Sequence, residues 1–357
     1  TAQTRSEDVN DQLYLFAAKL GMPRWDKDPV IRAKAAAELA YNTYSTSPGG
    51  ILNRDLEYLV TGGDERFATP DPAALNAVTP EGFRNVWEPL LKQGPIEVLV
   101  FGEFDQAAVI EQLRQTFGAL GPREAIAPEV AARVPAFAPV SPTPSVVTHR
   151  GDANQAAAVV AWPSGGGVAS LRESRQLEIL TQLFNNRLLE ALRERAGASY
   201  SPQVFSSWPT DLASGGRITA LAQLEPEFVP VFFTEAQRIA RDLAATPPTA
   251  DELARVTEPL SQLIRRASTG NQFWLFNLEG ATQDPQRTAL LRTLLADYSQ
   301  TTPQVMQFLA ERYLAKPSPF RLAVIPEGQT LAEAPAAGSG ASGNASATAA
   351  SAMPAGR

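Results

Sequence analysis

Residues 192–200 hold two polar side chains that could act together on a peptide bond. Arg193 falls in the last turn of a predicted helix, the chain reverses at Gly197, and Tyr200 opens the next predicted strand. A guanidinium and a phenol both donate hydrogen bonds, so the pair could bind a carbonyl or the oxyanion that develops from it. The alternative is structural: Arg193 complements the helix dipole at its C-terminus, and Tyr200 lies half in the core.

The composition restricts what else the chain can do. It has 357 residues, no cysteine and one histidine, His149. This excludes disulfides, thiolate metal sites and cysteine nucleophiles, and a self-contained His-rich zinc centre or Ser-His-Asp triad. We therefore expect no metal ligand set in this chain. His149 lies near the end of a predicted strand, beside Arg150, which favours a structural or exposed role over catalysis.

The charge and hydropathy patterns bear on partners. Acidic residues outnumber basic ones by 38 to 31, giving a formal charge of −7, which argues against nucleic acid or an anionic membrane as a partner. Apolar runs fall short of the ~18 residues that span a bilayer, and the polar start does not resemble a signal peptide. The compartment stays open, because a removed leader leaves no trace.

The sequence repeats itself. Residues 79–83 begin a predicted helix, which a predicted strand at residues 96–100 follows. Residues 302–306 likewise begin a predicted helix, which a predicted strand at residues 320–324 follows. The offset is 223 residues at the helix (302 − 79) and 224 at the strand (320 − 96). This predicts two copies of one domain, the first of which lacks about 80 residues at its start.

The repeat and the composition predict four segments. Residues 1–120 form the incomplete first copy, and residues 121–144, which are rich in proline, form a linker. Residues 145–327 form the complete second copy. Residues 328–357 form a disordered tail of Ala, Gly and Ser.

The second copy shows the periodicity of a mixed fold. Strands are expected at residues 145–150, 154–162, 203–208 and 217–224, the first two joined by a turn at Gly151 and Asp152. Residues 165–167 read as a flexible glycine connector, and helices are expected at residues 227–243 and 250–267. One helix carries an apolar stripe formed by Leu177, Leu180, Phe184 and Leu188. We therefore predict an α+β fold of two tandem α/β sandwich domains, each a mostly antiparallel sheet with helices on one face.

Two further segments each allow two structural interpretations. The strand that begins at Asn154, Gln155, Ala156 and Ala157 could bind substrate by pairing with an extended peptide at a sheet edge, or could be a buried strand. The aromatic residues Phe273, Trp274 and Phe276 are expected in the core, with a cavity-lining role for one of them as the alternative.

These features resemble a known family. Residues 192–200 match the Arg-x6-Tyr pair, and residues 101–105, Phe-Gly-Glu-Phe-Asp, match the turn after a strand, in the C-terminal half of the insulinase/pitrilysin zinc metallopeptidases. That family includes the mitochondrial processing peptidase subunits. The resemblance extends over residues 28–327, and the duplicated domain fits it.

The resemblance implies a division of labour. The N-terminal half, or a partner chain, holds zinc through an inverted His-x-x-Glu-His motif, and the C-terminal half binds the peptide. Arg193 and Tyr200 would then hold the substrate and polarise the scissile carbonyl. This chain departs from the catalytic pattern, since one histidine cannot hold the zinc.

The sequence therefore predicts the substrate-binding half of a two-half zinc metalloendopeptidase that hydrolyses peptides in a closed chamber, inactive alone. Its expected partners are a peptide and the zinc-binding N-terminal half or subunit. The alternative is a non-catalytic subunit or interaction module of the same fold. An independent serine hydrolase is disfavoured, because the chain has no Gly-x-Ser-x-Gly elbow. Bacterial relatives suggest a periplasmic location.

Overall fold

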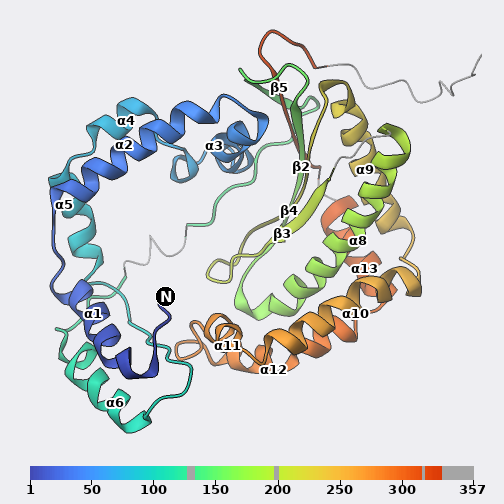
Figure 1. The fold of residues 1–357 in the computed structure, drawn as a ribbon. Coiled ribbons are helices and arrows are strands. Elements are labelled where there is room, and N and C mark those ends of the chain that lie inside the picture. The colour runs from blue at the N-terminus through green and yellow to red at the C-terminus, as the bar shows by residue number, and fades with distance from the viewer. Residues whose placement is uncertain (127–132, 197–200, 316–317, 332–357) are drawn as a thin grey trace, which may run out of the picture.

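The computed structural model describes residues 1–126, 133–196, 201–315 and 318–331 (Figure 1). We call residues 1–126 the first unit and residues 145–331 the second unit. The first unit is built from α1 (Val9–Gly21), α2 (Lys27–Tyr44), α3 (Pro48–Val60), α4 (Pro72–Ala77), α5 (Pro80–Leu90) and α6 (Gln106–Gln115). Residues 133–144 run between the units without helix or strand, and the predicted domain boundaries stay a prediction.

The second unit is a sheet covered by helices. Its strands are β1 (Ser145–His149), β2 (Ala156–Gly165), β3 (Gln203–Ser207), β4 (Ser214–Leu224) and β5 (Phe320–Pro326). Its helices are α8 (Leu171–Ala196), α9 (Val229–Ala245), α10 (Ala250–Ala267), α11 (Asn271–Asn277), α12 (Pro285–Ser299) and α13 (Pro303–Ala310), the last continued by the single turn η6 (Glu311–Ala315). The strand order is β1-β5-β2-β4-β3, with β1 and β5 parallel and the other neighbours antiparallel. The predicted α+β fold is confirmed.

Two pairs of helices keep the spacing of the sequence repeat. Helix α2 begins at Lys27 and α10 at Ala250, and α5 begins at Pro80 and α13 at Pro303, each pair 223 positions apart (250 − 27 and 303 − 80). The last two helices also begin in the same way. In each, a threonine side chain accepts a backbone N–H three residues on, and proline occupies the first turn, where its missing N–H costs nothing.

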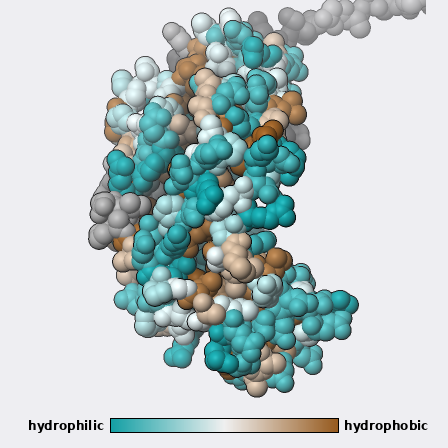
Figure 2. Space-filling model, turned by 90° about the vertical axis from the view of Figure 1, so that its left-hand side faces the viewer, coloured by the Kyte–Doolittle hydropathy of each residue, from teal (hydrophilic) through white to brown (hydrophobic). Residues whose placement is uncertain are grey.

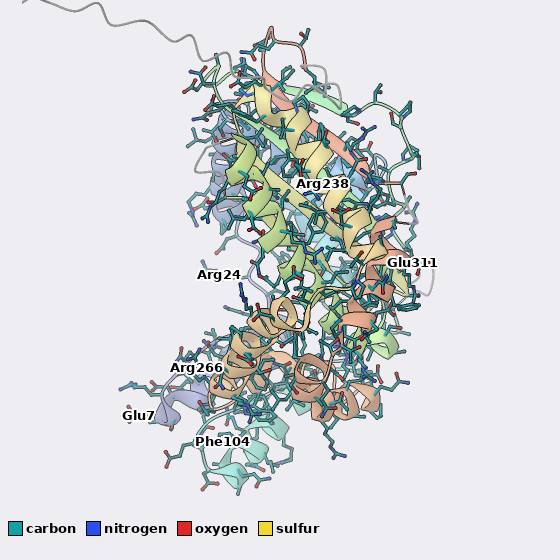
Figure 3. The ribbon with its side chains drawn as sticks, turned by 90° about the vertical axis from the view of Figure 1, so that its right-hand side faces the viewer. Glu7, Arg24, Phe104, Arg238, Arg266 and Glu311 are labelled. Atoms are coloured by element: carbon teal, nitrogen blue, oxygen red, sulfur yellow. The ribbon has the colours of Figure 1, made fainter. Side chains whose placement is uncertain are left out.

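One face of the sheet packs against helices of its own unit. On β2, Ala156, Ala158, Val160 and Trp162 point to this face, and all are at most 1% exposed. The ring of Trp162 lies 5.7 Å from that of Phe184 on α8, centroid to centroid. Helices α8, α9 and α13 contact one another over this layer. The outer side of α9 carries Arg238, which forms ion pairs with Glu235 and Asp242 (Figure 3).

Helix α3 of the first unit covers the opposite face. Ala157, Val159 and Ala161 of β2 point to it and are fully buried, and Ile51 on α3 is 1% exposed against them. Glu57 of α3 also forms an ion pair with Arg217 of β4. A strand buried on both faces reads as a nearly continuous apolar run, which explains the sequence of β2.

One sequence prediction about strands is wrong. Residues 96–100 form no strand, because a strand needs neighbours, and no described strand of the first unit lies beside them. The predicted strands at residues 145–150 and 154–162 are present as β1 and β2, and β5 lies between them in the sheet.

The first unit also touches the second through Glu97. Its carboxylate accepts hydrogen bonds from the backbone N–H of Gly280 at 2.5 Å and of Thr282 at 3.0 Å, and from the Thr282 hydroxyl at 2.5 Å. The Thr282 hydroxyl is the main reason that the pKa of Glu97 lies below its ordinary value of 4.5, and partial burial opposes this effect.

Viewed from the side on which α5 lies in Figure 1, the first unit shows apolar patches among polar side chains (Figure 2). The helices of the described residues include none long and apolar enough to cross a membrane.

We expect Glu97→Gln to weaken the contact with Gly280 and Thr282 at neutral pH. The loss should be only about 1 kcal/mol, because solvent screens the charge of this partly exposed group. A carboxyl whose pKa is lowered on folding stabilises the protein above its ordinary pKa, and this stability is lost as the pH falls through the lowered value. The difference in melting temperature between the wild type and Glu97→Gln should therefore shrink as the pH falls below 4.5. Thermal melts from pH 3 to 8 measure it, with Glu103→Gln in the same segment as control. A constant difference over that range would contradict this assignment.

Candidate functional site

Helix α8 carries the predicted Arg193 at its C-terminal end. The predicted apolar stripe is confirmed, because its four residues, Leu177, Leu180, Phe184 and Leu188, are completely buried. Leu192 continues the buried face at 2% exposure, and Arg193, one position on, is exposed. The helix therefore presents the guanidinium to solvent. Tyr200 lies outside the described residues, so its convergence with Arg193 stays a prediction.

Polar contacts fix the N-terminal half of α8. Arg175 and Asp297 of α12 form a buried ion pair at 2.7 Å, and Arg175 also donates to the Leu290 carbonyl at 2.7 Å. The hydroxyl of Tyr298 donates to Glu178, and that of Tyr313 donates to Glu173 at 2.8 Å. Burial raises the pKa of both tyrosines, so they stay neutral donors.

The turn before β2 contains the predicted Asn154 and Gln155. His149, 1% exposed, holds this turn from inside: its Nδ1 accepts the Gly151 N–H at 3.1 Å, and its Nε2 lies 2.7 Å from the Gln155 carbonyl. With Nδ1 accepting, Nε2 is the nitrogen placed to donate to the Gln155 carbonyl. The structural reading of His149 is confirmed.

Ala156 and Ala157 lie inside the sheet. Ala157 is opposite Gln223 of β4 on one side and Val324 of β5 on the other, and both alanines are buried. The strand is therefore buried, as one of the two readings expected, and the reading as a sheet edge is wrong because both of its sides are paired. Only Asn154 and Gln155 are exposed, and substrate binding by them stays a prediction.

The topology brings Arg193 and this turn to one end of the sheet. Strand β2 begins at Ala156, opposite Leu224, and β3 begins at Gln203, opposite Leu221. Both strands therefore start at the same sheet end, and α8 leads back to it from the far end of β2 (Figure 1). An extended ligand at this end could contact Arg193 and the turn together.

The glycines at residues 165–167 are not a flexible connector. The Gly167 N–H donates to Pro209 at 2.8 Å, and the Gly167 carbonyl accepts the indole N–H of Trp208 at 3.1 Å. A Cβ on Gly165 would lie 2.4 Å from the Trp208 ring. Because glycine has no Cβ, these residues allow this close approach. The sequence alone does not explain them, since they do not form a phosphate-loop motif.

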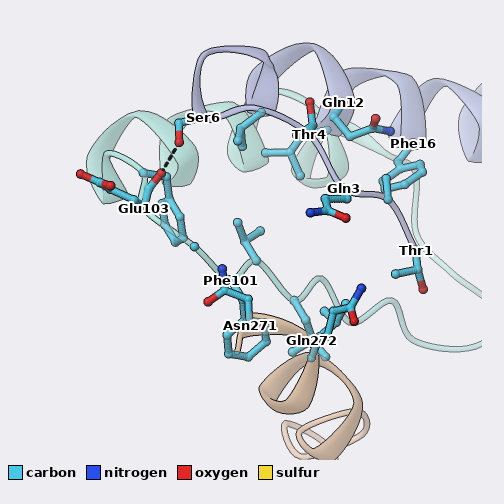
Figure 4. Close-up of a pocket in the computed structure, with 18 of the residues that line it drawn as sticks. Thr1, Gln3, Thr4, Ser6, Gln12, Phe16, Phe101, Glu103, Asn271 and Gln272 are labelled. Carbon is cyan, nitrogen blue, oxygen red and sulfur yellow. Dashed lines mark hydrogen bonds between the residues drawn. The ribbon is translucent and has the colours of Figure 1, made fainter. Parts of the chain in front are cut away.

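A cavity of about 420 Å³ lies elsewhere, between α1, residues 99–104 and α11 (Figure 4). Gln12 and Phe16 of α1 line one side, and Asn271 and Gln272 of α11 line the other. Phe276 also lines it and is 63% exposed. The expectation of a wholly buried aromatic cluster is therefore wrong, and the cavity-lining alternative holds for this member. Thr4, Ser6 and Glu103 also line it, so the cavity is mixed polar and apolar.

The described residues contain no group of three or more His, Cys, Asp and Glu side chains placed to hold a metal ion. The single histidine uses both ring nitrogens within the turn before β2. The residues present therefore do not fit a catalytic zinc.

The sheet and its helices define an α+β sandwich domain, and the comparisons show which family it belongs to. The model of the family described as "Peptidase M16 inactive domain" matches residues 77–260, just over half of the 357 residues. The chain belongs to this family of peptidase-associated, inactive domains. The expected resemblance to a C-terminal peptidase half is thereby confirmed. No curated protein matches the sequence significantly.

Solved structures share the fold. The peptidase M16 inactive domain from Pseudomonas fluorescens matches with a TM-score of 0.72 and 16% identity, over 90% of this chain and 75% of that one. A protease from Helicobacter pylori gives 0.71 and 14%, over 90% and 78%. The periplasmic protease PqqL from Escherichia coli gives 0.69 and 14%, over 91% of this chain but only 36% of its own length.

Replacing His149 by phenylalanine keeps a large ring but removes both hydrogen-bonding nitrogens. We expect a loss of stability of about 1–3 kcal/mol, because the part-buried Gly151 N–H and Gln155 carbonyl lose their partner. Hydrogen exchange at the Gly151 amide should become faster, and Val146→Ala, an exposed position on β1, should leave it unchanged. Equal protection of Gly151 in His149→Phe and the wild type would show that the ring does not hold this turn.

Proposed function

We propose that this chain is the substrate-binding half of a two-half zinc metalloendopeptidase that hydrolyses peptides in a closed chamber. The observation that carries the proposal is the exposed Arg193 at the end of a helix whose other half is fixed by buried polar contacts. Membership of the inactive-domain family supports it. The zinc, its ligands and the activated water belong to an N-terminal half or partner subunit in this proposal.

Arg193 acts here as a donor to the peptide. A guanidinium offers five N–H groups in a fixed fork, so it can hold a substrate carbonyl and the oxyanion that forms from it. Tyr200, seven positions on, would supply a second donor from the segment that precedes β3 in the sequence. The exposed turn at Asn154 and Gln155 lies at the same sheet end and would contact the flanking peptide backbone.

The second candidate is a non-catalytic subunit or interaction module. The family description "inactive domain" favours it, as does the use of the single histidine inside a turn. The two candidates differ in one respect: only the first makes Arg193 and Tyr200 contribute to turnover.

A periplasmic location is part of the proposal. It draws support from the fold shared with the periplasmic protease PqqL, of which this chain spans about a third. Fractionation of cells that express the protein with its natural leader region would test the location.

We expect Arg193→Ala and Tyr200→Phe, each in the assembled enzyme, to lower kcat/KM on a fluorogenic peptide by ~10²–10³-fold, because each removes a donor to the oxyanion. Zinc content should not change, since neither residue is a ligand. Arg172→Ala, at the other end of α8 and 66% exposed in its side chain, is the matched control and should keep normal activity. Unchanged kcat/KM in both test variants, with an active assembly, would reject the catalytic half in favour of the interaction module.

A further inference from the structure

The cavity of about 420 Å³ between α1, residues 99–104 and α11 brings together four carboxamide side chains. Gln3 and Gln12 line its first-unit side, and Asn271 and Gln272 line its α11 side (Figure 4). Within the part of the chain that the structure describes, none of these four carboxamides forms a hydrogen bond. Their donors and acceptors are therefore available to a ligand.

The two sides of the cavity carry the same pair of residue types. On α1, Phe16 follows Gln12 by four positions, and on α11, Phe276 follows Gln272 by four positions. Residues at i and i+4 lie on the same face of a helix, so each helix presents a carboxamide and a ring together. Gln12 and Gln272 are 260 positions apart (272 − 12), so the match is not a product of the 223-residue repeat.

The cavity offers a ligand little charge. Glu103 is the one charged side chain among the described residues that line it, and its carboxylate points away from the carboxamides (Figure 4). The hydroxyl of Ser6 is already used, since it donates to the Glu103 carbonyl at 2.7 Å. A charged group that entered the cavity would lose water without gaining an ion pair, which favours a neutral ligand.

An extended peptide has the polar groups that this arrangement requires. Its backbone presents N–H and C=O groups along both edges, and a carboxamide can donate to a carbonyl and accept from an N–H. Glutamines on opposite sides of the cavity can therefore each hold one edge of the chain. A nucleobase fits less well, because it is read by an amide in its own plane and stacked on a ring.

We propose that this cavity binds a short, uncharged, extended segment of a peptide. Gln12 holds one edge of its backbone and Gln272 the other, and its apolar side chains pack on Phe16 and Phe276. Phe276 is 63% exposed, so most of its surface is open to such a contact. The volume lies within the ~300–1,000 Å³ typical of small-ligand sites, so the segment is only a few residues long.

The bound segment lies within a peptide chain rather than at its end, because no described lining side chain is placed to pair with a terminal carboxylate or ammonium group. Arg193 is not among the lining residues, so this site is separate from the one proposed for the scissile bond. The inference does not rest on the proposed function.

Binding of Ac-Ala-Phe-Ala-NH2 to the 357-residue chain, measured by calorimetry at millimolar peptide concentrations, tests the proposal. The same tripeptide with free ends is the control ligand. It should bind at least ~10-fold more weakly, because its charged ends would lose water without an ion-pair partner. Absence of binding by the blocked peptide, equal binding of the free tripeptide, or binding of adenosine instead would each overturn the proposal.

Variants test the two sides of the cavity separately. Gln12→Leu and Gln272→Leu keep a side chain of similar size and remove its hydrogen bonds, so each should weaken binding of the blocked peptide about 3–10-fold. Gln300→Leu, at an exposed glutamine outside the cavity, should bind as the wild type does. Equal melting temperatures establish that all three variants are folded, and unchanged binding in both cavity variants would contradict the proposed contacts.

A peptide held from both sides should also join the two units more tightly. Hydrogen exchange at the Gly280 and Thr282 amides, which donate to Glu97 of the first unit, should become slower when the blocked peptide binds. Binding without this change would overturn the two-sided site. The kcat/KM of Arg193→Ala reports on the proposed function, so the two proposals can fail independently.

Discussion

Burial of β2 on both faces is the constraint that joins the two units. Alternate residues of this strand face opposite sides of the sheet, and those from Ala156 to Trp162 are all at most 1% exposed. Helices of the second unit can cover one side only, since α8, α9 and α13 form a single layer. The other side depends on α3, and without it Val159, Leu322 and Val324 would face water. The second unit therefore needs the first.

The dependence runs in both directions. Helix α3 lies on β5 and β2 of the second unit, and α11 lies beside residues 99–101, the segment of the first unit that corresponds to β5. The two helices begin 223 positions apart (271 − 48), so equivalent helices of the repeat lie at the two junctions. Glu97 strengthens the second junction through Gly280 and Thr282.

The sequence revealed those features that depend on local pattern. The stripe on α8 follows from the helical period, and α10 begins and ends at the predicted residues because a capping box at Thr249 and Glu252 fixes its start. Pairing between distant segments was not visible. The apolar alternation of residues 96–100 favours a strand but says nothing of whether a neighbour exists, and the insertion of β5 between β1 and β2 leaves no local mark.

The candidate site, like the fold, could be predicted from the sequence only in part. The exposure of Arg193 fits the buried face of α8, since Arg193 follows the buried pair Ala191 and Leu192 and so lies past the edge of the apolar stripe. For Ala156 and Ala157 the sequence left an edge strand and a buried strand open, because an apolar strand looks the same whether one or both of its sides are paired. The role of His149 depends on the turn that folds back over it, and only the structure shows that Gly151 and Gln155 use both ring nitrogens.

The distribution of polar groups along α8 bears on the role proposed for Arg193. Arg175, Glu173 and Glu178 in its first half are all engaged with α12 or η6, and Arg187 in its middle pairs with Glu252 of α10 at 3.0 Å. A buried pair such as Arg175 and Asp297 adds little net stability but is costly to break. It therefore fixes the position of the helix and contributes little to the stability of the fold. A donor is useful to a transition state only if it needs no reorganisation. A helix fixed along two thirds of its length and open at its end meets that condition for Arg193.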